Sequence, residues 1–173
     1  MTRPFTSLGP QEALHAAICI EERNAGIYQR FAEMFTEFRD AESMEIASVF
    51  WDMSVEEKRH SSLLQSKYAE RFGDVSCALT EEDLHELIEV PCLEDGDVFP
   101  GPESRPVPAR DRALQVALHA EKSAHNFYTK LVATTTDKPL RRLYVELSTM
   151  EDGHVTYLQG MLSMSTAEKH EVQ

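Results

Sequence analysis

Apolar residues recur at the spacing of an α-helix in four long segments of the chain. We predict helices over residues 11–35, 41–68, 111–134 and 138–163. Prolines crowd the stretch between the second and third helices, so residues 72–110 are predicted to form a crossover. A short helix in this crossover is predicted to begin at the capping pair Thr80 and Asp83. The pattern predicts an all-α antiparallel four-helix bundle, made of two helical hairpins joined by the crossover.

The two predicted hairpins resemble each other in sequence. Residues 13–31 align with residues 113–131 without a gap, and the second helix matches the fourth at one constant offset. The matched polar positions are Glu21 and Tyr28 with Glu121 and Tyr128, then Ser54, Glu57 and His60 with Ser148, Glu151 and His154. We expect a bundle with approximate twofold symmetry.

Some of these polar residues interrupt stripes that are otherwise apolar. The ExxH pairs Glu57 with His60 and Glu151 with His154 follow the spacing of the buried seam. The pairs Glu12 with His15 and Glu82 with His85 sit at helix beginnings and are predicted to be solvated.

Glu21 and Glu121 add one inward acid each, giving four carboxylates and two imidazoles in the predicted interior. Buried carboxylates require a charged partner or a metal, so we predict a two-metal site. The alternative is ordinary salt bridges, with Tyr28 and Tyr128 as core packing. His125, one turn after Glu121, is an alternative further ligand, although we favour a surface or hydrogen-bonded histidine there.

The segments EERNAGIY, VEEKRH, AEKSAHNFY and MEDGH resemble the ligand segments of ferritin-like di-iron carboxylate proteins, and of rubrerythrins in particular. The resemblance covers almost the whole chain. It implies that Glu21 and Glu121 are terminal ligands, that Glu57 and Glu151 bridge, and that His60 and His154 each bind one metal. It places Tyr28 and Tyr128 beside the ligands, as candidate catalytic residues.

The chain also departs from the rubrerythrin pattern. It has no paired CxxC motif for a rubredoxin module, so we expect an external electron donor such as a rubredoxin-like protein. Ala124 stands where rubrerythrins carry an extra glutamate, which leaves the symmetric six-ligand set of bacterioferritins. Lys58 stands where bacterioferritins have a haem-binding methionine, so no haem is expected.

The resemblance implies a non-haem di-iron oxidoreductase that reduces peroxide or dioxygen as iron(II) is oxidised. Four carboxylates neutralise two divalent cations, and this donor set suits two iron ions while also accepting manganese or zinc. Three alternatives stay open: an iron storage or carrier bundle without turnover, a structural zinc site, and a di-iron hydroxylase of the same superfamily.

Composition limits the domain organisation, the partners and the cellular compartment that we expect. With 173 residues and 42% hydrophobic content, the chain can bury one core, and we predict a single domain over residues 1–173. The formal net charge of −13 argues against nucleic acid or an anionic membrane as a partner. The three cysteines form no CxxC, and no signal peptide or membrane span is evident, so we expect a cytoplasmic protein. The family resemblance implies a homodimer or a higher homo-oligomer.

Overall fold

The computed structural model describes residues 5–74, 79–80, 83–84, 87 and 106–171. A short 3-10 helix, η1 (Phe5–Ser7), precedes four long α-helices: α1 (Pro10–Phe38), α2 (Ala41–Phe72), α4 (Pro106–Thr134) and α5 (Lys138–Glu171). No β-strand occurs within these ranges. The predicted all-α four-helix bundle is therefore confirmed.

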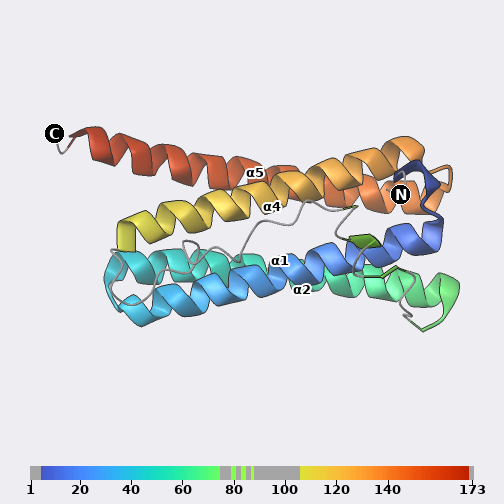
Figure 1. Ribbon diagram of the computed structural model, residues 1–173, viewed down its shortest axis with the longest axis horizontal. Coiled ribbons are helices and arrows are strands. Elements are labelled where there is room, and N and C mark those ends of the chain that lie inside the picture. The colour runs from blue at the N-terminus through green and yellow to red at the C-terminus, as the bar shows by residue number, and fades with distance from the viewer. Residues whose placement is uncertain (1–4, 75–78, 81–82, 85–86, 88–105, 172–173) are drawn as a thin grey trace.

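The helices form two antiparallel hairpins. α1 packs chiefly against α2, and α4 packs chiefly against α5. α2 ends at one end of the bundle and α4 begins at the other, so α2 and α4 run in the same direction (Figure 1). Two successive helices that run in the same direction can be joined only by a segment long enough to span the bundle.

Capping residues define the turn in each hairpin. Arg39, with φ 59°, ends α1 in the left-handed region. Asp40 then caps α2, because its Oδ1 accepts a hydrogen bond of 2.8 Å from the Ser43 backbone N–H. In the other hairpin, Asp137 Oδ1 accepts one of 3.0 Å from the Leu140 N–H. Short turns of this kind hold each helix beside the next one in sequence.

The helices extend beyond the predicted limits. α2 continues to Phe72 and is followed by Gly73 at φ 83°. α4 begins at Pro106, within the predicted crossover, because a proline in the first turn lacks only an N–H that the helix does not use. Thr80 and Asp83 make the predicted reciprocal capping bonds, and most of the crossover lies outside the described residues.

The hydrophobic core consists of two clusters separated along the bundle. One includes Leu14, Ile18, Leu64 and Leu147, and the other includes Phe31, Phe35, Phe50, Leu114 and Leu158. Tyr128 belongs to the first cluster and Tyr28 to the second. Fully buried glutamates lie between the clusters in sequence on every long helix. The bundle therefore has a polar layer within an apolar interior.

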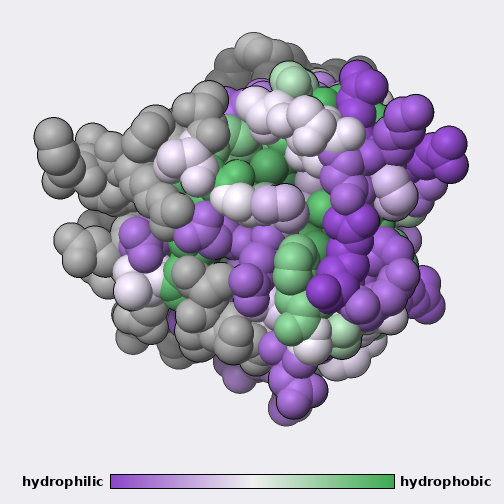
Figure 2. Space-filling view, turned by 90° about the vertical axis from the view of Figure 1, so that its right-hand side faces the viewer, coloured by the Kyte–Doolittle hydropathy of each residue, from purple (hydrophilic) through white to green (hydrophobic). Residues whose placement is uncertain are grey.

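Hydrophilic residues cover much of the described surface, as Figure 2 shows for the end of the bundle where α1 begins. A cavity of about 180 Å³ lies at this end, lined by residues that include Phe5, Leu131, Asp137 and Tyr144. None of the six predicted metal ligands lines this cavity. Among the described helices, none has an apolar stretch long enough to cross a bilayer.

Candidate metal centre

All four long helices contribute to the polar layer. α1 provides Glu21, α2 provides Glu57 and His60, α4 provides Glu121, and α5 provides Glu151 and His154. A spacing of three residues places the acid and the imidazole of each ExxH pair on one helix face. All four glutamates have 0% exposure, so water does not solvate their carboxylates.

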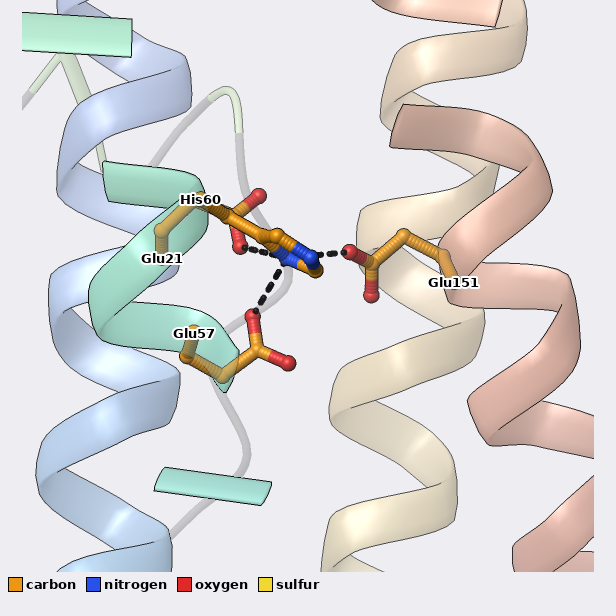
Figure 3. A group of neighbouring side chains, drawn as sticks. All are labelled: Glu21, Glu57, His60 and Glu151. Atoms are coloured by element: carbon orange, nitrogen blue, oxygen red, sulfur yellow. Dashed lines mark hydrogen bonds and ion pairs between the residues drawn. The ribbon is translucent and has the colours of Figure 1, made fainter. Parts of the chain in front are cut away.

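His60 lies at the centre of one group of acids. Its Nδ1 atom lies 3.3 Å from Glu21 Oε2, 3.5 Å from Glu57 Oε2 and 3.5 Å from Glu151 Oε1. Figure 3 shows these three carboxylates, from α1, α2 and α5, converging on one nitrogen. A single N–H cannot donate to three acceptors in good geometry, whereas a cation can be bound by all four groups.

His154 has the same relationship to a second group of acids. Its Nδ1 atom lies 3.2 Å from Glu57 Oε1, 3.3 Å from Glu121 Oε2 and 4.0 Å from Glu151 Oε2. The rings of His60 and His154 are stacked with their centroids 6.0 Å apart. Glu57 and Glu151 belong to both groups, each of which can hold a metal ion. The arrangement is therefore two adjoining sites that share two carboxylates.

The carboxylates of Glu57 and Glu151 are shared by both groups. All four of their oxygens are buried, and none has a hydrogen-bond partner among the residues that the structure describes. The imidazole nitrogens approach these oxygens, but not in hydrogen-bonding geometry. An unpaired buried carboxylate is costly, so the donor set fits cations that contact these four oxygens.

Two tyrosines fix the outer carboxylates. The Tyr28 hydroxyl on α1 donates to Glu121 Oε1 on α4, and the Tyr128 hydroxyl on α4 donates to Glu21 Oε1 on α1. Both tyrosines are fully buried. Glu21 and Glu121 each thus have one oxygen held by a tyrosine and the other directed toward an imidazole.

Burial and mutual repulsion shift the pKa values of the acids. Burial, together with the Glu57 carboxylate, raises the pKa of Glu21 well above its usual range. Burial and the charges of Glu21 and Glu57 raise the pKa of Glu151 likewise. Burial opposes ionisation of Glu57, but interactions with the Glu21 carboxyl and with His154 and His60 outweigh it and lower the pKa. Without metal, protons must therefore compensate the excess negative charge.

The neighbouring carboxylates raise the pKa values of both imidazoles. Burial lowers the pKa of His60, but the carboxylates of Glu21 and Glu57 outweigh burial and raise it to about 10. Burial also opposes protonation of His154, and Glu121 and Glu57 raise its pKa to about 11. In the metal-free centre, the protonated imidazoles therefore neutralise carboxylate charge that divalent cations would otherwise neutralise.

Carboxylate oxygen and imidazole nitrogen are donors that iron(II), manganese(II) and zinc(II) accept. Four carboxylates, if all are ionised, carry the charge of two divalent cations. The side-chain types, their charge and the unpaired oxygens of Glu57 and Glu151 all fit a dinuclear centre.

Two other histidines from the sequence analysis lie elsewhere. His125 belongs to neither group, and its Nδ1 lies 2.9 Å from the Ser148 carbonyl oxygen. His15 was predicted to be solvated, which is wrong: it is buried, and its Nδ1 accepts a hydrogen bond from the Leu79 N–H at 3.1 Å. Glu12 caps α1 by accepting from the Gly9 N–H. His85 and Glu82 lie outside the described residues.

Sequence reasoning missed Glu56, whose Oε2 lies 2.8 Å from His154 Nε2. Glu56 precedes a predicted ligand and belongs to no apolar stripe, so only its position beside Glu57 could have drawn attention to it. Sequence reasoning also missed Asn24, which is fully buried one turn after Glu21. A buried asparagine at that helical spacing was a signal available in the sequence.

Comparison with known proteins identifies a related family and two structures with a similar fold. Residues 12–94 match the protein family described as Rubrerythrin. Among solved structures, an uncharacterized conserved protein from Magnetospirillum magnetotacticum MS-1 aligns with a TM-score of 0.70 and 19% identity, over 91% of this chain and 95% of that chain. A hypothetical protein from Pyrococcus furiosus aligns with a TM-score of 0.64 and 22% identity, over 95% of this chain and 96% of that chain.

At these identities the two structures show a common fold. No curated protein matched the chain. The resemblance to rubrerythrin-like proteins of the ferritin-like superfamily is confirmed by the family match over residues 12–94 and by the shared fold.

Proposed function

We propose that the protein is a rubrerythrin-like oxidoreductase with a dinuclear, non-haem iron centre that reduces peroxide or dioxygen. The observation that carries this proposal is the pair of adjoining carboxylate and imidazole groups that share Glu57 and Glu151. The four unpaired oxygens of these two glutamates indicate a role as bridges. The family match over residues 12–94 gives independent support.

Each residue of the centre has a distinct role in this proposal. His60 and Glu21 would hold one iron and His154 and Glu121 the other, while Glu57 and Glu151, which belong to both groups, would be available to each. Tyr28 and Tyr128 orient the terminal glutamates and keep hydroxyl protons close to the site, because burial raises the pKa of both phenols. The two apolar clusters exclude water from either side along the bundle.

A bound pair of iron(II) ions would supply two electrons, one from each ion, and these with two protons are enough to reduce one hydrogen peroxide molecule to two water molecules. We propose that an external donor, such as a rubredoxin-like protein, returns these electrons. The protein side chains bind, orient and hold protons, and the ferritin-like bundle keeps them at fixed positions.

An anaerobic single-turnover experiment tests the proposal. Protein loaded with two equivalents of iron(II) should oxidise them on mixing with peroxide much faster than iron(II) in buffer, followed by absorbance in the near ultraviolet. Glu57→Gln should remove most of this acceleration, and Glu45→Gln, which changes an exposed acid of the same helix, should retain it.

A rate equal to that in buffer would contradict the proposal. Tight zinc binding combined with no acceleration for iron would instead favour the structural-zinc alternative. A large mineral content, with many irons for each chain, would favour storage.

A further inference from the structure

The two histidines of the centre differ on their outer side. His154 turns Nδ1 toward the acids and Nε2 toward Glu56, whose Oε2 lies 2.8 Å away. Glu56 is on α2 and His154 is on α5, so the contact joins the two hairpins. The Glu56 side chain is 50% exposed, whereas that of His154 is only 14% exposed. Glu56 therefore holds the imidazole from the solvent side.

Among the residues that the structure describes, His60 has no equivalent partner. The offset that matches Glu57 with Glu151 and His60 with His154 also matches Glu56 with Met150. Met150 is 44% exposed, and its thioether is only a weak hydrogen-bond acceptor. Within the described ranges, no hydrogen bond to His60 Nε2 is found. The approximate symmetry of the bundle thus supplies an internal comparison: within the described part of the chain, His154 has an outer carboxylate and His60 does not.

An outer carboxylate has a defined effect on a ligating histidine. An ionised carboxylate can only accept, so the imidazole donates from Nε2 and keeps the lone pair of Nδ1 for a metal. The contact also fixes the ring orientation and makes the imidazole a better donor to the metal. Loss of such a contact typically weakens metal binding about 10–100-fold.

We propose that Glu56 is a positioning residue for His154 and makes the metal position of His154 the tighter of the two. The inference rests on the dinuclear centre of the proposed function, but it does not depend on turnover. It predicts that two ions of the same metal bind with unequal affinity. The position formed by His154, Glu57, Glu121 and Glu151 should fill first.

Calorimetry with cobalt(II) and metal-free protein tests this inference, and the visible spectrum of cobalt distinguishes the two positions. Wild type should show two binding events of different affinity. Glu56→Ala should weaken the tighter event about 10–100-fold and alter the spectrum of the first equivalent. Met150→Glu should strengthen the weaker event. The matched control Glu45→Ala removes an exposed acid of α2 about 16 Å along the helix from Glu56 and should change neither event.

A structural role for Glu56 would leave the cobalt spectrum unchanged. The inference is contradicted if Glu56→Ala resembles Glu45→Ala, or if it weakens both events equally. Absence of cobalt binding to wild type would contradict both the inference and the proposed centre. Unequal cobalt binding together with no reaction between the iron-loaded protein and peroxide would support the inference and contradict only the proposed activity.

Discussion

Tyr28 on α1 donates its hydroxyl hydrogen to Glu121 on α4, across the interface between the two hairpins. Its counterpart Tyr128 donates to Glu21 in the opposite direction. These buried bonds connect the hairpins directly at the polar layer. They also restrict the carboxylates of Glu21 and Glu121 without any metal, so the protein itself partly organises the proposed centre.

Tyr28→Phe should destabilise the metal-free protein by about 1–3 kcal/mol, because a buried oxygen of Glu121 loses this donor while the aromatic ring still fills its space. Urea unfolding monitored by circular dichroism measures the change. Tyr157→Phe serves as the control, because Tyr157 is 51% exposed and should be nearly neutral. Equal effects of the two variants would show that the bond across the hairpins contributes nothing.

His125→Ala should leave the metal stoichiometry unchanged at about two for each chain. His125 Nδ1 lies 2.9 Å from the Ser148 carbonyl oxygen and belongs to neither carboxylate group. Elemental analysis after reconstitution and desalting measures the stoichiometry, and His154→Ala is the comparison that should lose metal. Loss of one metal ion from the His125→Ala variant would show that His125 is a metal ligand.

Removal of metal should lower the melting temperature. We expect cations to neutralise the carboxylates of Glu57 and Glu151, and therefore to bind the folded state in preference to the unfolded chain. At a free metal concentration of about 100 Kd, one site contributes about 2.7 kcal/mol. Scanning calorimetry with zinc(II) and with excess chelator measures the difference. A melting temperature that is independent of metal would contradict binding at the polar layer.

The metal-free protein should become less stable as pH rises from about 6.5 to 10. The pKa of His60 is about 10 and that of His154 about 11, whereas an unfolded histidine titrates near about 6.5. The unfolded chain therefore binds fewer protons in this range, and stability falls with pH. The contribution is fully present below about pH 6.5 and is lost as pH rises through the folded pKa values. The raised pKa values of Glu21 and Glu151 act in the same direction.

Melting temperatures measured in chelator across this pH range test whether stability falls as pH rises. His154→Gln should make the dependence shallower, because it removes one of the two retained protons. Metal competes with the same protons, so zinc affinity should rise with pH and the loaded protein should lose less stability. A melting temperature that rises steadily from about pH 6.5 to 10 in chelator would contradict the raised pKa values of His60 and His154.

The fold and the inward position of the six proposed ligands could be predicted because both follow from helical periodicity. A spacing of three or four residues fixes which side chains share a face, and two matching hairpins repeat the pattern. Glu57 and His60 interrupt an apolar stripe, which marks them as inward without any knowledge of their neighbours.

Contacts between distant segments could not be predicted in this way. The Glu56 contact depends on how α5 is rotated against α2, and periodicity along one helix does not determine that rotation. His15 is buried and accepts a hydrogen bond from the backbone N–H of Leu79, which lies far along the chain. The start of α4 at Pro106 was missed because proline is compatible both with a first turn and with a connection.

The most direct test of the dinuclear centre is a crystal structure of the iron-reconstituted protein with anomalous diffraction at the iron edge. The arrangement predicts two anomalous peaks in each chain, one beside His60 and one beside His154, with the carboxylates of Glu57 and Glu151 contacting both. No peak, with Glu57 and Glu151 paired only to protonated imidazoles, would contradict it.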